Sequence, residues 1–293
     1  MRKKLKILWT CLSVFALASA SAQTTLQIAT KHLEKEFGGI HTVIIEAEKA
    51  DIEVLVWNKS NVQLSMDLSA KHPEKSVAAQ DLNFLKSGID AKNGQLRLRN
   101  YILLSQKDKK PESNFKVKYV LKIPENTDLQ IKNSFGKIYH SGETKKLSIT
   151  AEFCTISLNH IKGISKIQTK YGELNIDGVD GNTGIKTERS NVTLKNFSGV
   201  FSIDTYYGEI KLISPKDVQN VKLNGDKSDI QLKQIPTRKY KINLSTNFGQ
   251  IHLPTEFGTP IKVKNSEQVF YNSAEKSSIK ITNKSGNITL EKL

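Results

Sequence analysis

The chain has 293 residues, of which 38% are hydrophobic and 25% charged, so it is too apolar for a disordered protein and long enough for one or two folded domains. The formal net charge is +15, and the seven prolines are too few for a long proline-rich linker. No run of 18 apolar residues occurs beyond the N-terminus, which excludes an internal membrane-spanning helix.

The N-terminus has the pattern of a secretory signal peptide. A basic segment, Met1–Lys6, precedes an apolar run over Ile7–Ala18 and a small-residue cleavage motif over Ala20–Ala22. We therefore predict a signal peptide over residues 1–22 and export to the periplasm, the outer-membrane surface or the medium. The apolar run is shorter than the ~20 residues that a membrane anchor needs. The threonine before Cys11 is not the small residue usually found before a lipidated cysteine.

Export limits the partners that the mature chain can meet. Residues 1–22 contain four basic and no acidic residues, so cleavage leaves a net charge of +11 and a single cysteine, Cys154, which cannot form an intramolecular disulfide. A basic exported protein is attracted to anionic envelope polymers or lipids, whereas nucleic acid belongs to another compartment. We expect an anionic envelope polymer, a glycan or a surface protein as partner, or a basic surface that serves solubility alone. The oligomeric state stays open.

The first part of the mature chain is expected to be irregular. We predict a linker over residues 23–36 and one short helix near residues 73–87, where Pro73 suits the first turn. A polar loop over residues 105–114 and an alternating strand over residues 115–123 follow.

From residue 129 onward the chain repeats every 18 residues. One column is isoleucine in five successive copies, a second column seven residues later is aliphatic, and a column of small residues lies between them. The three columns are Ile131, Ile149, Ile167, Ile185 and Ile203; Ile138, Ile156, Leu174, Val192 and Ile210; and Gly136, Cys154, Gly172, Ser190 and Gly208. Further copies with other spacings match residues 45–54, 89–98, 223–232, 244–253 and 281–290, with an excursion over residues 254–278 before the last copy.

The repeat predicts an all-β solenoid. Within each copy, apolar and polar residues alternate with the period of a strand that has one buried face, and the alternation changes phase at the small-residue column, where the chain can bend. One copy cannot bury its apolar face alone. We therefore expect coils of about 18–21 residues to stack in parallel about 4.8 Å apart. The alternative, a two-sheet sandwich of hairpins, would not keep equivalent residues at constant spacing.

The same segments resemble a bacterial domain family. Alternating strands at Val54–Trp57 and Tyr119–Pro124 precede glycine-containing repeats at Leu129–Ile138 and Tyr171–Ile176. This layout is similar to the bacterial "putative adhesin" domains of unknown function, also called toastrack domains, over about residues 37–293.

The resemblance implies a fold and a location rather than an activity. It implies a single-stranded right-handed parallel β-helix, irregular over residues 37–128 and regular over residues 129–293. Such proteins are exported or tethered to a membrane, and they are linked to envelope surfaces or envelope-stress systems. The resemblance supplies no catalytic residues. Arg189-Ser190 and Lys227-Ser228 depart from the Asn-Gly-like pair that the family favours, which we expect to change local turns rather than the fold.

The sequence contains no convincing catalytic or metal-binding constellation. The six histidines have no metal-ligand spacing, and His140 falls in an apolar column, where we expect a partly buried core residue. Cys154 occupies the small-residue column, where we expect a buried, unreactive thiol. We predict no cofactor and no metal site.

Outward-facing carboxylates offer the main enzymatic alternative, because some β-helices cleave polysaccharides. Glu173 and Glu209 are two coils apart, about 9.6 Å at one strand spacing per coil, which approaches the carboxylate separation of an inverting glycosidase. Asp229 belongs to the same column. However, Asn191 lies between the two glutamates, and no column combines several acids with a basic catalyst. We therefore favour a protein that is not an enzyme.

Two further columns bear on the surface. Glu152, Lys170 and Glu188 alternate in sign and are expected to form a charge ladder on a solvated face. An aromatic column has the parity of the buried residues, so we expect it to stack inside the core at the corner. Its members are Phe135, Phe153, Tyr171, Arg189 and Tyr207. Tyr206 then points outward and is the best candidate for a surface contact, and Glu173 and Glu209 are further candidates.

We interpret the chain as an exported, non-enzymatic β-solenoid of the cell envelope or surface, with an adhesin-like binding or scaffolding role. One alternative is a carbohydrate-active β-helix enzyme that uses Glu173, Glu209 or Asp229. The other is an accessory component of envelope-stress signalling.

Overall fold

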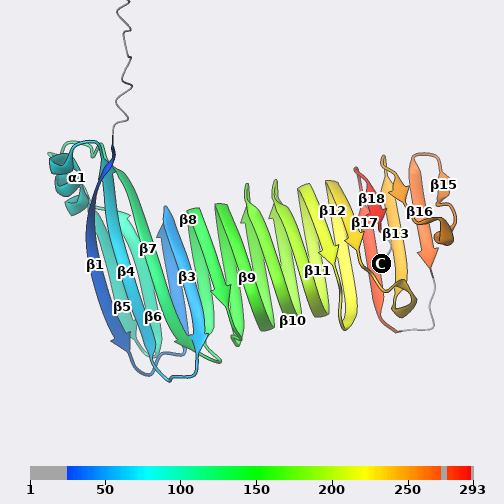
Figure 1. Cartoon of the computed structure of the whole chain (residues 1–293), viewed down its shortest axis with the longest axis horizontal. Coiled ribbons are helices and arrows are strands. Elements are labelled where there is room, and N and C mark those ends of the chain that lie inside the picture. The colour runs from blue at the N-terminus through cyan, green and yellow to red at the C-terminus, as the bar shows by residue number, and fades with distance from the viewer. Residues whose placement is uncertain (1–24, 272–275, 292–293) are drawn as a thin grey trace, which may run out of the picture.

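The computed structural model describes residues 25–271 and 276–291, which form one long, narrow body whose strands run across its long axis (Figure 1). The predicted signal peptide, its cleavage site and Cys11 lie outside the described residues. Within the described ranges, no helix is long and apolar enough to cross a membrane.

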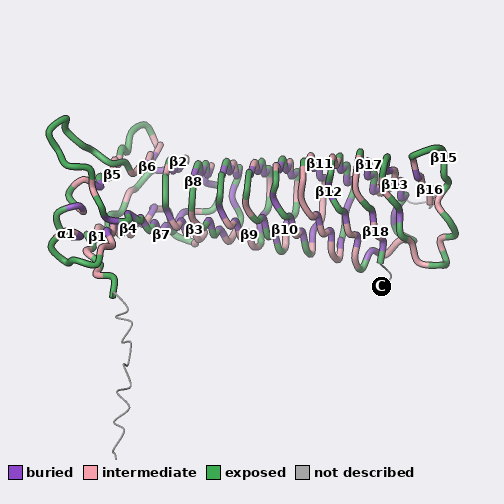
Figure 2. The backbone as a smooth tube through the Cα atoms, turned by 90° about the horizontal axis from the view of Figure 1, so that it is seen from above, coloured by how far each residue is buried: buried purple, intermediate pink, exposed green. Residues whose placement is uncertain are grey.

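The centre of the body is a stack of parallel windings, as the repeat predicts. Ile131 pairs with Ile149, and Ile167, Ile185 and Ile203 lie in register on successive strands. All five side chains of this column are at most 2% exposed, so the core is a continuous internal stack between the two faces of each winding. The strands are β8 (Asp128–Ser141), β9 (Lys146–Lys170), β10 (Glu173–Glu188), β11 (Asn191–Ile213) and β12 (Val218–Lys233). The fold is therefore a parallel β-solenoid, seen from above in Figure 2.

Each winding turns sharply at the small-residue column. The residue before it adopts a left-handed conformation, with φ of 54° at Phe153 and Tyr171 and 55° at Tyr207. A Cβ atom built on Gly172 would lie 2.1 Å from the carbonyl oxygen of Cys154, because the backbones of successive windings approach closely at this corner.

The N-terminal part joins the first winding through parallel ladders and adds antiparallel strands beyond them. The copy at residues 45–54 is confirmed as a winding, because β2 and β3 both pair in parallel with β8. The expected linker over residues 23–36 is instead mostly strand, since β1 pairs with β4 along its whole length and covers the edge of that sheet. The strands are β1 (Gln27–Phe37), β2 (Thr42–Glu48), β3 (Ala50–Trp57), β4 (Val62–His72) and β7 (Asn114–Pro124).

The predicted helix is shorter than expected, and the copy at residues 89–98 is not a winding. The helix α1 spans Lys75–Asp81, continues as the 3-10 turn η1 (Leu82–Phe84), and gives way to β5 (Leu85–Lys92). β5 and β6 (Gln95–Ile102) form an antiparallel hairpin, because Asn93 and Gly94 both adopt positive φ in the connecting turn. A hairpin strand and a solenoid strand share the same alternation, so the pattern alone does not separate them.

The last two copies are windings, but their order in space differs from their order in the chain. β17 (Ser278–Asn283) and β18 (Ile288–Leu290) lie between β12 on one side and β13 (Lys241–Asn247) with β14 (Ile251–His252) on the other. The chain therefore leaves one layer free after β12, builds the outer winding, and returns to fill the free layer. The 3-10 turn η2 spans Thr237–Lys239, and the excursion between the two windings contains η3 (Thr255–Phe257), β15 (Ile261–Val263) and β16 (Ser266–Tyr271).

Candidate functional site

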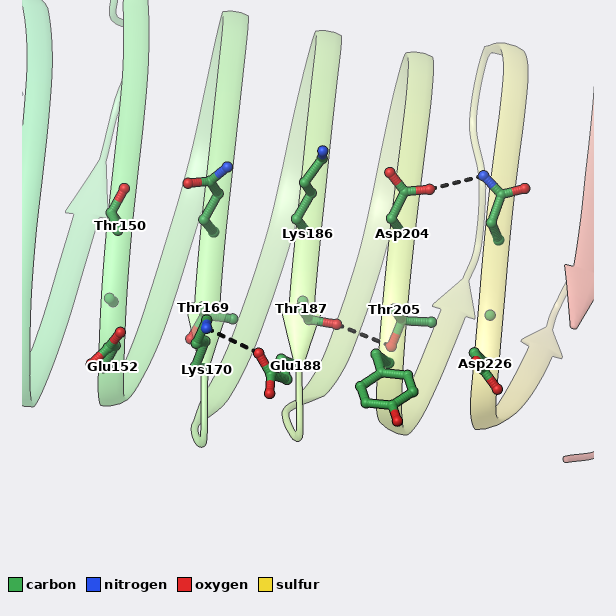
Figure 3. A pocket seen from close by; sticks show the side chains of 15 residues that line it. Thr150, Glu152, Thr169, Lys170, Lys186, Thr187, Glu188, Asp204, Thr205 and Asp226 are labelled. Atoms are coloured by element: carbon green, nitrogen blue, oxygen red, sulfur yellow. Dashed lines mark hydrogen bonds and ion pairs between the residues drawn. The ribbon is translucent and has the colours of Figure 1, made fainter. Parts of the chain in front are cut away.

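A groove on the outer surface crosses five windings and has a volume of about 560 Å³ (Figure 3). We call it the axial groove because it follows the long axis. One wall, the distal row, consists of Thr150, Gln168, Lys186, Asp204 and Asn224. The other wall, the corner row, consists of Glu152, Lys170, Glu188, Tyr206 and Asp226.

The strand period explains how the groove forms. Residues two apart on a strand point to the same side, so each winding contributes one outward side chain to each wall. The residue between them points into the core, and only its backbone forms the floor. The floor residues are small, and the first four of them are buried, so their side chains add no bulk to the groove: Ala151, Thr169, Thr187, Thr205 and Gly225.

Hydrogen bonds and ion pairs fix the groove walls. The Lys170 ammonium lies 3.0 Å from the Glu188 carboxylate, and this hydrogen bond raises the pKa of Lys170. This pair is part of the charge ladder that the sequence predicts. Within the distal row, the Asn224 side-chain amide donates to the Asp204 carboxylate at 2.8 Å.

The axial groove is locally acidic although the chain as a whole is basic. Its walls carry four carboxylates and two amines, and one of those amines, that of Lys170, is already paired with Glu188. The excess of basic residues in the chain therefore lies outside the groove walls. A polyanion entering the groove would meet repulsion from the walls.

The corner beside the groove carries an exposed ladder of rings and cations. The Phe135 and Phe153 rings stack at 4.9 Å with an interplanar angle of 2°, and Phe153 and Tyr171 stack at 4.9 Å and 7°. These three side chains are 47%, 47% and 43% exposed, so the prediction of an internal aromatic stack is wrong. The left-handed residue at the corner breaks the strand alternation, so its side chain points out although its parity is that of the core.

Cations continue this corner ladder. The Arg189 guanidinium lies 5.8 Å from the Tyr171 ring centroid and 5.3 Å from that of Tyr207. The Lys227 ammonium lies 5.0 Å from the Tyr207 ring and donates to its hydroxyl at 2.9 Å, which lowers the pKa of Tyr207. Tyr206, which is 40% exposed, packs edge to face on Tyr207 at 4.5 Å and so connects the ladder to the corner row of the groove.

The other residues that the sequence singles out lie beyond the corner, on the strand segments that follow the small-residue column. We call the side of the solenoid that these segments form the second face. Glu209 and Asp229 line a separate hollow of about 300 Å³ together with His252, whereas Glu173 is not part of it. The Glu209 carboxylate lies 2.7 Å from the Lys211 ammonium, and Asp229 accepts the backbone N–H of Asn287 at 2.9 Å. The structure therefore does not bring Glu173 and Glu209 together in one cleft.

The chain matches the model of a known protein family. The family model described as Toastrack DUF4097 matches residues 36–291. The chain belongs to the Toastrack family. None of the curated proteins compared with the chain matches it.

Three solved structures resemble this Toastrack chain at low sequence identity. A "putative cell adhesion protein" from Clostridium sporogenes ATCC 15579 has 10% identity and a TM-score of 0.29, covering 90% of this chain and 100% of its own. A "putative lipid binding protein" from Parabacteroides distasonis ATCC 8503 has 13% identity and a TM-score of 0.41, with coverage of 90% and 97%. A "putative adhesin" from Bacteroides fragilis NCTC 9343 has 9% identity and a TM-score of 0.30, with coverage of 89% and 97%.

Cys154 and His140 are core residues of this Toastrack chain. Burial raises the pKa of the Cys154 thiol, whose Sγ lies 3.2 Å from the carbonyl oxygen of Glu152. His140 is 0% exposed, and its Nδ1–H donates to the carbonyl oxygen of Val54 at 3.0 Å. No group of three or more His, Cys, Asp or Glu side chains in the described ranges is placed to hold a metal ion.

Burial of His140 predicts a pH-dependent stability. Desolvation lowers its pKa from 6.5 to about 4, so the unfolded chain takes up a proton in this interval and the folded chain does not. The free energy of unfolding should therefore fall as the pH falls from about 6.5 to 4, and His140 should contribute at most about 3 kcal/mol to this loss. Urea unfolding at pH 7 and pH 4.5 should show a smaller pH difference for His140→Leu than for wild type. An equal pH difference in the two proteins would contradict this assignment.

Proposed function

We propose that this Toastrack protein is an exported binding protein of the cell envelope that holds an extended polymer and does not catalyse a reaction. The signal-peptide pattern over residues 1–22 supports export, and the mature chain then begins at residue 23. The observation that carries the proposal is the axial groove, whose walls repeat over five windings along the long axis.

The form of the groove suits a linear ligand. Clefts that bind compact small molecules are concave on several sides, whereas this groove repeats the same two rows from winding to winding. A polymer that lies along the axis meets both rows at every step. Solenoids commonly use such extended surfaces for binding.

The engagement of the second-face carboxylates favours binding over catalysis. A general acid must be free to protonate a leaving group, yet Glu209 is paired with Lys211, and Asp229 accepts a backbone N–H. Glu173 lies outside the hollow that these two residues line. Hydrolysis of a polysaccharide that is lost in Glu209→Gln would overturn this part of the proposal.

Binding of the mature chain to immobilised polymers tests the proposal. The panel should contain neutral polysaccharides, phosphate-bearing and uronate-bearing polymers, and a surface-protein fraction. We expect retention of at least one linear polymer, and loss of that retention in Gln168→Trp, which places a bulky side chain in the distal row of the groove. Ser157→Trp, on the second face, serves as the control. Retention that survives Gln168→Trp, or no retention of any polymer, would contradict the proposal.

A further inference from the structure

We propose that the axial groove takes an uncharged linear oligosaccharide, with Tyr206 as the surface on which one sugar ring stacks. This inference rests on the proposed function and specifies its ligand class. It follows from the charge of the groove walls, from their repeat distance, and from the position of their single aromatic residue.

The charge of the walls selects against an anionic polymer. Glu152, Glu188, Asp204 and Asp226 supply four carboxylates against two wall amines, those of Lys170 and Lys186. The Lys170 ammonium lies 3.0 Å from Glu188, and Lys284, which is outside the walls, lies 3.9 Å from Asp226. A uronate or phosphate chain would lie against these carboxylates along its length. Uncharged hydroxyl groups instead can donate hydrogen bonds to carboxylates, which are acceptors only.

The repeat distance of the walls suits a chain of pyranose rings. Neighbouring strands lie about 4.8 Å apart. This spacing is close to the advance per sugar of an extended, β-1,4-linked pyranose chain. Each sugar would then meet the distal row and the corner row of one winding. The groove crosses five windings, so it spans four such steps, about 19 Å. We therefore expect affinity to rise with oligosaccharide length up to about five sugars.

Tyr206 is the one aromatic side chain among the groove-lining residues. The edge-to-face contact with Tyr207 at 4.5 Å holds its ring in place, which lowers the conformational cost of binding. The ladder rings Phe135, Phe153 and Tyr171 cover one another's faces, so they are less suited to stack on a sugar.

A polar pair stands across the groove from Tyr206. Asp204 is two residues earlier on the same strand, and Asn224 pairs with it on the next strand, with the amide donating to the carboxylate at 2.8 Å. Figure 3 shows Asp204 in the distal row, with this hydrogen bond dashed. The second carboxylate oxygen of Asp204 and the amide oxygen of Asn224 remain able to accept from sugar hydroxyl groups. A ring that stacks on Tyr206 would therefore be flanked by acceptors.

Titration calorimetry on the mature chain tests the inference. The probes are cellohexaose, hexa-N-acetylchitohexaose and laminarihexaose as neutral hexamers, the corresponding trimers, and polygalacturonate and polyphosphate as polyanions. We expect at least one neutral hexamer to bind more tightly than its trimer, with little change at high salt. Tyr206→Ala should weaken that binding roughly tenfold or more, because it removes the stacking ring.

The matched control is Tyr139→Ala, which removes a 36% exposed tyrosine from the second face of the first regular winding and should leave affinity unchanged. Thermal melting of both variants shows whether each retains the fold. Salt-sensitive binding of the polyanions alone would overturn this inference while leaving the proposed function intact. Neutral binding that Tyr206→Ala does not weaken would overturn the assignment of Tyr206, and binding of none of the probes or polymers would overturn both proposals.

Discussion

A chain that ends at Ser277 is expected to lose the order of residues 241–271 as well as the last winding. β17 pairs with both β12 and β13, and β18 pairs with both β12 and β14. The other described ladder of β13 is with β16, which belongs to the same outer segment. Removing β17 and β18 therefore takes away the ladders that join the outer winding to the body and exposes an edge of β12.

Hydrogen exchange of backbone amides measures this effect. We expect residues 241–271 to exchange as fast as exposed loops, while the windings over residues 128–233 keep their protection, because each winding contacts mainly its neighbours. A chain that ends at Glu291 is the control and should exchange like the full chain. Retained protection of residues 241–271 in the shorter chain would contradict the prediction, since it would mean that the outer winding can pair directly with β12.

Ile167→Asp is expected to prevent stable folding. Ile167 is 1% exposed in the column that also contains Ile149 and Ile185, and the described structure offers its side chain no cationic partner there. The aspartate carboxylate would lose its hydration without gaining a partner, and the column would lose the packing of the isoleucine side chain. We expect a loss of more than about 4 kcal/mol, which is a large part of the stability of an ordinary domain.

A matched control for this substitution lies on the same strand. Ile164 is 55% exposed, so Ile164→Asp makes the same chemical change at the surface and should alter the melting temperature little. Circular dichroism melting and size-exclusion chromatography distinguish the two variants. A soluble Ile167→Asp protein that melts like wild type would be incompatible with the stacked core.

The windings could be predicted because one column, such as Ile131 to Ile203, keeps both its residue type and its spacing. The order of the last windings along the long axis could not be predicted. The copies at residues 244–253 and 281–290 present the same apolar face, so either could stack on β12. The prediction that residues 89–98 form a winding was wrong for a related reason. Strand alternation does not show whether two consecutive strands pair with each other as an antiparallel hairpin or stack in parallel on other windings.

The candidate site was less predictable than the fold. The rows that form the axial groove follow from strand alternation, and Tyr206 is exposed on one of them, but the hollow between the rows has no sequence signature. The corner ladder was placed on the wrong side because one left-handed residue, such as Phe153 with φ of 54°, reverses the direction that parity implies. A bulky residue before the small-residue column, in the five copies from Phe135 to Tyr207, is the signal that could have indicated this conformation.

The in-register stacking also has a consequence for how such proteins can vary. Between β9 and β11, every 18-residue unit has the same kind of neighbour above and below, with equivalent residues opposite one another. Duplicating or deleting one whole unit would preserve those contacts, whereas an insertion of any other length would shift the register. The length of the solenoid surface can therefore change in steps of one unit by gene duplication, and the interior packing stays the same.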